Sequence, residues 1–175
     1  MNIFLTGQPQ VGKSTIINRF LKSHDNLTVG GFKTVSNFKR DIGVYGGVYI
    51  LPAHLNESDF NEESLVGNRV LKPKSFPERF DLKGVEILQN SPNNDLILMD
   101  EIGFMETKAL KFSETVLNIL NNDTPVIGVV KPMDKGLPLK VKLHPKTVVL
   151  EITEENREEK YLEFEKLVLD MLINA

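Results

Sequence analysis

The most informative stretch of the sequence is Gly7-Gln8-Pro9-Gln10-Val11-Gly12-Lys13-Ser14. It matches the pattern G-x-x-x-x-G-K-[ST] of a phosphate-binding loop, or P-loop. Glycines permit such a backbone to turn its N–H groups around a cluster of anionic oxygens. Residues 2–6 are apolar and predict a buried strand, and residues 14–21 carry apolar side chains at helical spacing. A strand, a glycine-rich loop and a helix in this order predict an α/β fold built on parallel strands.

The positions of the loop have expected roles in binding a nucleoside triphosphate. The helix after the loop directs the positive end of its dipole at the phosphates. We expect Lys13 to bridge the β- and γ-phosphates and the Ser14 hydroxyl to ligate Mg²⁺, the predicted cofactor. The nucleotide-binding residues predicted in this segment are Gly7, Gln8, Pro9, Gln10, Val11, Gly12, Lys13, Ser14 and Thr15. The expected ligand is ATP or GTP, and the residues leave the preference between them open.

An acidic pair ends a second predicted strand, residues 95–100. The carboxyl ends of strands in an open α/β sheet face the ligand crevice. We expect Asp100 to hold the magnesium ion or a water bound to it, and Glu101 to accept a proton from the attacking water. With Lys13, these two are the predicted catalytic residues, and Ser14 and Asp100 are the predicted metal ligands. Asp100 and Gly103 also fit a D-x-x-G spacing, in which the glycine N–H can meet the γ-phosphate.

The length of the chain predicts a single domain over residues 1–175. Further strands are predicted at 125–130 and 147–152, and helices at 77–91, 107–120 and 153–172, the last with Thr153 as N-cap. Residues 30–51 predict an inserted antiparallel hairpin, 52–75 a loop with short β pieces, and 131–146 a basic connection. We expect five to seven strands. By analogy with P-loop proteins that have a glutamate beside the acidic strand-end residue, we place 126–130 between strands 2–6 and 95–100.

Composition excludes several classes of protein. The chain has no cysteine, which rules out disulfides and thiolate metal sites, and no apolar run long enough for a transmembrane helix. The N-terminal residues lack the pattern of a signal peptide. From the absence of cysteine we expect a cytoplasmic protein. A net charge of −3 makes nucleic acid an unlikely partner. Oligomeric state is left open.

Several basic residues are weaker candidates. Lys39, Arg40, Arg69 and Arg79 are candidates for an additional cation at the phosphates, although each has the character of a solvated surface charge. The lysines of residues 131–146 favour a solvated loop over a phosphate or RNA clamp, because no aromatic residues alternate with them. Arg157 follows the last predicted strand and is a candidate to stack on the base.

Three segments resemble the THEP-type nucleoside-triphosphatases, the family of the cancer-related nucleoside-triphosphatase. They are the P-loop, Asp100-Glu101-Ile102-Gly103-Phe104-Met105-Glu106 and Ile152-Thr153-Glu154-Glu155-Asn156-Arg157, in the family's order. The resemblance implies a P-loop NTPase three-layer sandwich, with a mainly parallel sheet and an inserted antiparallel hairpin. It also implies slow Mg²⁺-dependent hydrolysis of ATP, GTP and other nucleoside triphosphates, with Asp100 and Glu101 at the family's acidic positions. Phe104 departs from the family, which often has lysine there, so this protein must do without that cation or use another.

Two other classes of function share the same motifs. A small-molecule kinase would use Asp100 or Glu101 to deprotonate an acceptor hydroxyl, with the hairpin and residues 52–75 as the acceptor pocket. A slow nucleotide-dependent binding module would use the hairpin to contact a partner. Phosphate release in the absence of an added acceptor distinguishes hydrolysis from both alternatives.

Overall fold

The computed structural model describes residues 1–38, 43–56, 58–70 and 72–174. Within these residues, eight strands form one sheet in the order β5-β4-β3-β2-β6-β7-β1-β8. The strands are β1 Asn2–Thr6, β2 Val29–Asn37, β3 Gly47–Pro52, β4 Leu65–Asn68, β5 Lys74–Ser75, β6 Leu96–Ile102, β7 Val126–Val130 and β8 Thr147–Glu151. The helices are α1 Lys13–Ser23, α2 Pro77–Arg79, α3 Val85–Gln89, α4 Leu110–Asn121, α5 Gly136–Lys142 and α6 Arg157–Ile173, with a π-helical turn, η1 Phe80–Gly84, joining α2 to α3.

The parallel part of the sheet consists of β2, β6, β7, β1 and β8. Strands β1 and β7 are fully buried, as expected of parallel strands covered on both faces. Strand β7 pairs with β1 on one side and with β6 on the other, which confirms the predicted place of residues 126–130. The loops that follow β1, β6 and β7 therefore meet at one edge of the sheet.

The predicted hairpin is confirmed, but it is part of a larger antiparallel extension. Strand β2 pairs antiparallel with β3 and at the same time parallel with β6, so the hairpin continues the main sheet. Strands β4 and β5 continue it further, each antiparallel to its neighbour. The sheet consequently has more strands than the five to seven expected.

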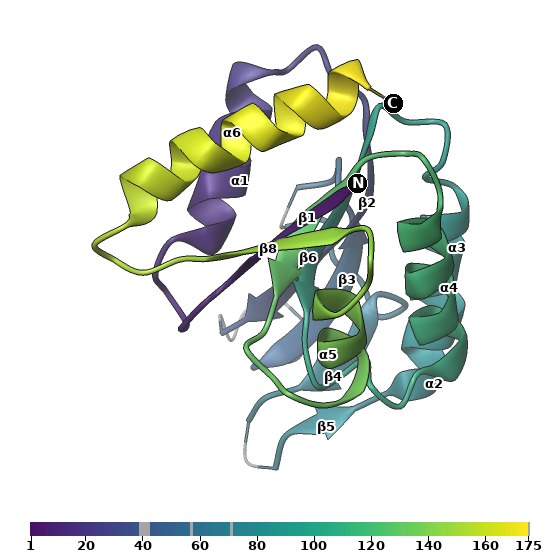
Figure 1. Cartoon of the computed structure of the whole chain (residues 1–175). Helices are drawn as coiled ribbons and strands as arrows, with labels where there is room; N and C mark the ends of the chain where they lie inside the picture. The colour runs from purple at the N-terminus through teal and green to yellow at the C-terminus, as the bar shows by residue number, and fades with distance from the viewer. Residues whose placement is uncertain (39–42, 57, 71, 175) are drawn as a thin grey trace.

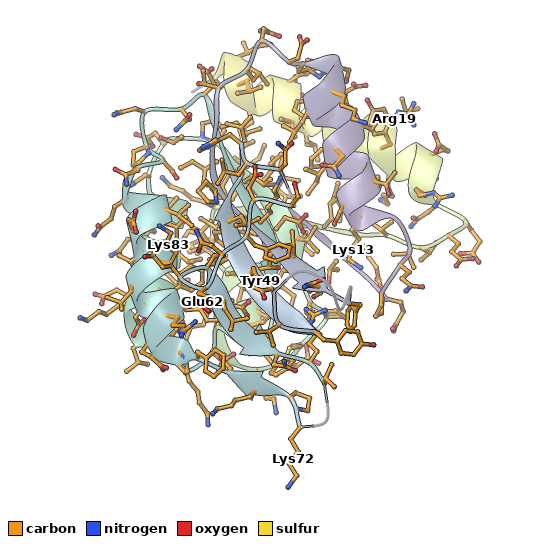
Figure 2. All side chains as sticks on the ribbon, turned by 180° about the vertical axis from the view of Figure 1, so that it is seen from behind. Lys13, Arg19, Tyr49, Glu62, Lys72 and Lys83 are labelled. Atoms are coloured by element: carbon orange, nitrogen blue, oxygen red, sulfur yellow. The ribbon has the colours of Figure 1, made fainter. Side chains whose placement is uncertain are left out.

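Helices cover both faces of the sheet (Figure 1). Helices α1 and α6 lie on one face, where Phe20 and Phe164 pack with Ile3 and Leu5 of β1. Helices α3, α4 and α5 lie on the other, where Phe112 packs among residues of the sheet. Seen from behind in Figure 2, Arg19 and Lys83 project from these two helical layers, with Tyr49 in the sheet between them. No helix in the described ranges is long and apolar enough to cross a membrane.

Two boundaries differ from the predictions. Residues 131–146 are not only a connection, because Gly136–Lys142 form α5, which buries Leu137 and Val141 against the α4 side of the core. The last helix begins at Arg157, later than a Thr153 N-cap requires. Thr153 and Asn156 instead close a turn before the helix, since the side-chain oxygen of each accepts the backbone N–H of the other at 3.2 and 2.8 Å.

Candidate active site

Two glycines shape the phosphate-binding loop between β1 and α1. Gly7 and Gly12 have positive φ angles of 134° and 98°, in the region that favours glycine. A Cβ at Gly7 would lie 2.3 Å from the carbonyl oxygen of Ile152, just beyond β8. A Cβ at Gly12 would lie 2.7 Å from Cδ of Arg157. Gly7 is therefore required by close approach to backbone as well as by its φ angle, whereas Gly12 is required by its φ angle, because the Arg157 side chain can move.

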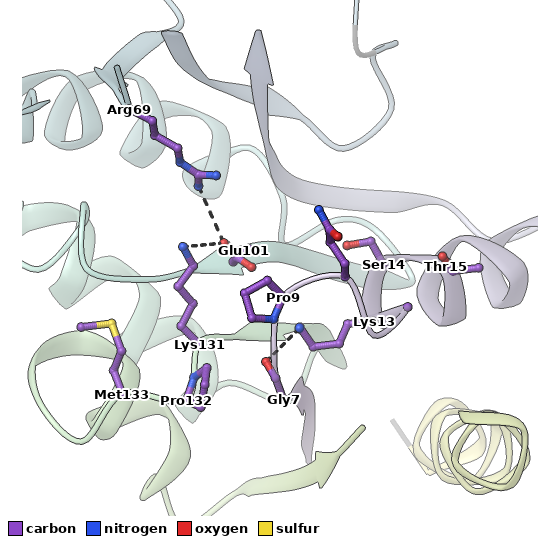
Figure 3. Close-up of a pocket in the computed structure, with 12 residues that line it drawn as sticks. Gly7, Pro9, Lys13, Ser14, Thr15, Arg69, Glu101, Lys131, Pro132 and Met133 are labelled. Carbon is purple, nitrogen blue, oxygen red and sulfur yellow. Dashed lines mark hydrogen bonds and ion pairs between the residues drawn. The ribbon is translucent and has the colours of Figure 1, made fainter. Parts of the chain in front are cut away.

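Lys13 is the buried cation of the loop. Its side chain curls back over the loop, and Nζ donates to the carbonyl oxygen of Gly7 at 2.9 Å (Figure 3). Nζ also donates to the carbonyl oxygen of Gln8 at 2.6 Å. Burial lowers the pKa of Lys13 from its ordinary value, while the carboxylates of Glu101 and Asp100 act in the opposite direction. The ammonium is thus held at the loop and faces the acidic strand end.

Ser14 and Asp100 come together across the site, as the predicted metal ligands should. Oγ of Ser14 lies 3.4 Å from Oδ1 of Asp100. Mg²⁺ binds oxygens at about 2.1 Å, so two ligands of one ion lie at most about 4.2 Å apart, and this pair fits. No cluster of three or more acidic, histidine or cysteine side chains able to hold a metal occurs in the described part of the chain. A magnesium ion here would complete its shell with phosphate oxygens and water, as it commonly does.

The end of β6 brings both acidic residues to the same side. Consecutive residues of a regular strand point to opposite faces. Here the pairing with β7 shifts between Asp100 and Ile102, so that Glu101 is an extra residue in the strand. Such irregularities redirect side chains beside active sites. Asp100 and Glu101 accordingly line one small cavity together with Ser14.

Glu101 is held by two cations. Its Oε1 lies 3.0 Å from Nζ of Lys131 and 3.9 Å from a guanidinium nitrogen of Arg69, as Figure 3 shows. Lys131 follows β7, and Arg69 follows β4. The two cations therefore reach the carboxylate from different parts of the sheet.

A pocket of about 570 Å³ contains most of the predicted residues, a volume suited to a small-molecule ligand. It is lined by Gly7, Pro9, Gln10, Gly12, Lys13, Ser14, Thr15, Arg69, Glu101, Lys131, Pro132 and Met133. Gln8 and Val11 do not line it, and the Val11 side chain packs into the core beside β1. The pocket opens at the loop and at the end of β6, where the two predicted halves of the site meet.

Asp100, Gly103 and Arg157 do not line this pocket, and Asp100 lines the smaller cavity instead. The Gly103 N–H donates to Oε2 of Glu106 at 2.9 Å, so the structure directs it at a side chain of its own turn. Arg157 is exposed, and its side chain lies against Gly12 at the start of α1. Arg157 therefore lies beside the P-loop, and its contact with the base stays a prediction.

The structure places the candidate cations for the phosphates differently. Lys39 and Arg40 lie outside the described residues. Arg79 donates to the backbone oxygens of Glu62 and Leu65 at 2.8 and 3.0 Å, which gives it a structural role. Arg69 lines the pocket.

Lys131, Pro132 and Met133 line the pocket without having been predicted there, and Glu106 is buried beneath the site. Lys131 was expected in a solvated loop, but its side chain is only 28% exposed and lines the pocket. The available signal was its position directly after a buried strand, the same place from which the other site residues come. For Glu106 the sequence showed only that it lies in the segment Asp100–Glu106, and this position did not indicate that its side chain is buried.

Known proteins of one family are similar to this chain over most of its length. The family described as NTPase matches residues 2–164. Nucleoside-triphosphatase THEP1 of Methanocaldococcus jannaschii is 35% identical over 151 residues, covering 78% of this chain and 85% of that protein. The cancer-related nucleoside-triphosphatase homolog of Bos taurus is 30% identical over 174 residues, covering 89% and 90%.

Solved structures confirm the fold. The crystal structure of THEP1 from Aquifex aeolicus superposes with a TM-score of 0.74 at 22% identity, covering 96% of this chain and 99% of that one. The solution structure of a human cancer-related nucleoside triphosphatase gives 0.69 at 22% identity, covering 95% and 96%. The match over residues 2–164, together with relatives similar over most of their length, shows that the chain belongs to the NTPase family of THEP1.

Proposed function

We propose that this protein hydrolyses ATP, GTP and other nucleoside triphosphates to the nucleoside diphosphate and phosphate, with Mg²⁺ as cofactor. One observation carries the proposal: Lys13, the pair Ser14–Asp100 and Glu101 converge at one edge of the sheet. The similar proteins of Methanocaldococcus and Bos taurus are named as nucleoside-triphosphatases, which supports the same class of reaction here.

The loop binds the phosphates in this proposal. Backbone N–H groups of residues 8–14, except Pro9, which has none, surround the anionic oxygens together with the N-terminus of α1. Lys13 exchanges its carbonyl partners for the β- and γ-phosphates. Ser14 and Asp100 are the side chains that would hold Mg²⁺. When bound there, the ion neutralises charge on the phosphate oxygens and helps to orient them.

Glu101 acts on the water. A water oxygen forms a bond to the γ-phosphorus, the bond from that phosphorus to the β–γ bridging oxygen breaks, and its electron pair stays on the diphosphate. Glu101 accepts a hydrogen bond from the water and takes its proton, which then passes to the phosphate product. Because phosphoryl transfer is loose, positioning of the water supplies much of the benefit.

Arg157 and Gly103 have secondary roles. Arg157, placed over Gly12, stacks its planar guanidinium on the base. The Gly103 N–H reaches the γ-phosphate only if it leaves Glu106, its partner in the structure.

Substitution of the acidic pair tests the proposal. Glu101→Gln keeps the size of the side chain but removes its charge. It should retain binding of the magnesium nucleotide and lose roughly 10²- to 10⁴-fold in turnover, the range for a general base. Asp100→Asn should lose magnesium dependence and binding together, because it acts on the ion. Single-turnover phosphate release with no added acceptor, measured beside direct nucleotide binding, gives both quantities.

Glu114→Gln on the exposed face of α4 is the matched control and should behave as the unmodified protein. Near-normal hydrolysis by Glu101→Gln would place water activation elsewhere. If the unmodified protein released no phosphate from any nucleotide until an acceptor was added, the reaction would be that of a kinase.

A further inference from the structure

Lys131 leaves the sheet between the two halves of the site. It is the first residue after β7, the strand that separates the P-loop strand β1 from the acidic strand β6. Its backbone N–H donates to the carbonyl oxygen of Ile102 at 2.9 Å, which fixes the start of the loop to the end of β6. The side chain thus begins at a rigid point beside both the phosphate loop and the acidic pair.

The stem of Lys131 runs along a path that Gly103 leaves open. A Cβ at Gly103 would lie 3.0 Å from Cδ of Lys131 and 3.3 Å from Cε, closer than most such contacts in proteins. The ring of Phe104 flanks the other end, with its centroid 5.8 Å from Nζ, within the range of a cation–π contact. These contacts direct the ammonium into the pocket rather than into solvent.

The ammonium lies within the electric field of the reacting groups. Its Nζ is 3.0 Å from Oε1 of Glu101, the proposed base. Its positive charge contributes to lowering the pKa of Lys13, although burial of Lys13 has the larger effect. The positive charges of Lys131 and Lys13 therefore both face the inside of the pocket.

Phosphoryl transfer gains from a cation beyond the lysine of the loop, because charge spreads over the transferring oxygens in the transition state. Among the described cations considered above, Lys131 has the closest contact with Glu101. Arg69 lies at 3.9 Å, and Arg79 is committed to backbone oxygens. A triphosphate bears more negative charge than one carboxylate, so it competes with Glu101 for the ammonium.

We infer that Lys131 is the catalytic cation of this site, and that it moves from Glu101 to the γ-phosphate when a nucleoside triphosphate binds. The inference rests on the proposed function and adds a residue to it. The exchange has two effects. It places positive charge on the transferring group, and it releases the Glu101 carboxylate from the closer of its two cations, leaving only the longer contact with Arg69. The base therefore becomes more available when the γ-phosphate is in place.

The substitution Lys131→Met tests the exchange, because methionine retains most of the unbranched stem and lacks the charge. Turnover of MgATP under single-turnover conditions should fall roughly 10²- to 10³-fold, the cost typical of losing one charge-stabilising donor. Binding of MgADP, which has no γ-phosphate, should change by less than about threefold, and the preference for a triphosphate over ADP should shrink. Lys131→Arg should recover part of the turnover.

Lys140→Met is the matched control, since Lys140 is exposed on α5 and outside the pocket. It should leave turnover and both affinities unchanged. If Lys131→Met retains turnover and the ATP-to-ADP affinity ratio within about threefold of the unmodified protein, the inference is wrong. Failure of the proposed function would look different, as absence of phosphate release from the unmodified protein. In that case the affinity ratio alone decides whether Lys131 contacts the γ-phosphate.

Discussion

Glu106 is a carboxyl group buried beneath the site, only 4% exposed, whose Oε2 accepts the N–H of Gly103 at 2.9 Å. Burial raises its pKa from 4.5 to about 7; the hydrogen bond and the charge of Lys131 oppose the rise, and Glu101 adds to it. Between these two values the folded protein keeps a proton that the unfolded chain releases, so stability decreases as pH rises from about 4.5 to about 7. Over this pH interval the loss in the free energy of unfolding is at most about 3 kcal/mol.

Glu106→Gln should remove that slope, because glutamine can accept the same N–H without ionising. Urea denaturation from pH 5 to pH 8 measures the free energy of unfolding at each pH. The stability of the variant relative to that of the unmodified protein should increase as pH rises. Glu114→Gln, exposed on α4, should keep the original slope. A slope equally steep in Glu106→Gln would show that the pH dependence comes from another group.

Residues within local motifs could be predicted, and residues joined only by the fold could not. Lys13 and Ser14 belong to one contiguous loop whose residue pattern alone indicates phosphate binding. Asp100 and Glu101 directly follow an apolar strand. The contact of Lys131 with Glu101 needs more than the predicted neighbouring of β6 and β7, because it depends on the course of the Lys131 side chain beside Gly103. The burial of Glu106 likewise depends on the packing of its turn.

At the scale of elements, apolar runs predicted the parallel strands β1, β6, β7 and β8, whereas helix α5 was missed. Strands β4 and β5 were expected only as short β pieces without bounds or partners. Helix α5 has only seven residues and alternates its apolar side chains with lysines, so its charge concealed its buried face. Strand β5 has two residues, and its pairing with β4 comes from the sheet rather than from any pattern of its own.

The packing of helix α4 against its neighbours can be tested at one buried side chain, Phe112. Phe112 is fully buried, with its ring centroid 5.3 Å from that of Phe32 and 5.5 Å from that of Phe80. Phe112→Ala should lower the free energy of unfolding by about 3–5 kcal/mol, because the cavity adds to the lost apolar burial. Leu110→Ala on the same helix, where the side chain is 76% exposed, should change it by less than about 0.5 kcal/mol. Urea unfolding of both variants checks this, and equal losses would contradict the packing described.

For the whole molecule, binding at the sheet edge should stabilise the fold, because the site joins β1, β6 and β7 and exists only when they are assembled. A non-hydrolysable triphosphate with Mg²⁺, at about 100 times its dissociation constant, should add about 2.7 kcal/mol and raise Tm. Lys13→Ala should show a much smaller increase at the same ligand concentration, because it loses the cation placed on the phosphates. An identical increase in the variant would mean that the ligand binds elsewhere.

The strand order also has a consequence for synthesis on the ribosome. Strand β1 is made first, yet its two neighbours, β7 and β8, begin only at Val126 and Thr147. At about 5–20 residues per second, roughly 6–24 s pass between the completion of β1 and the start of β7. During that interval the apolar segment Ile3–Leu5 has no partner strand, and the phosphate loop has no surface to close against. The nascent chain therefore carries an apolar, unpaired strand throughout this interval, and nucleotide affinity is acquired only after β7 and β8 have been made.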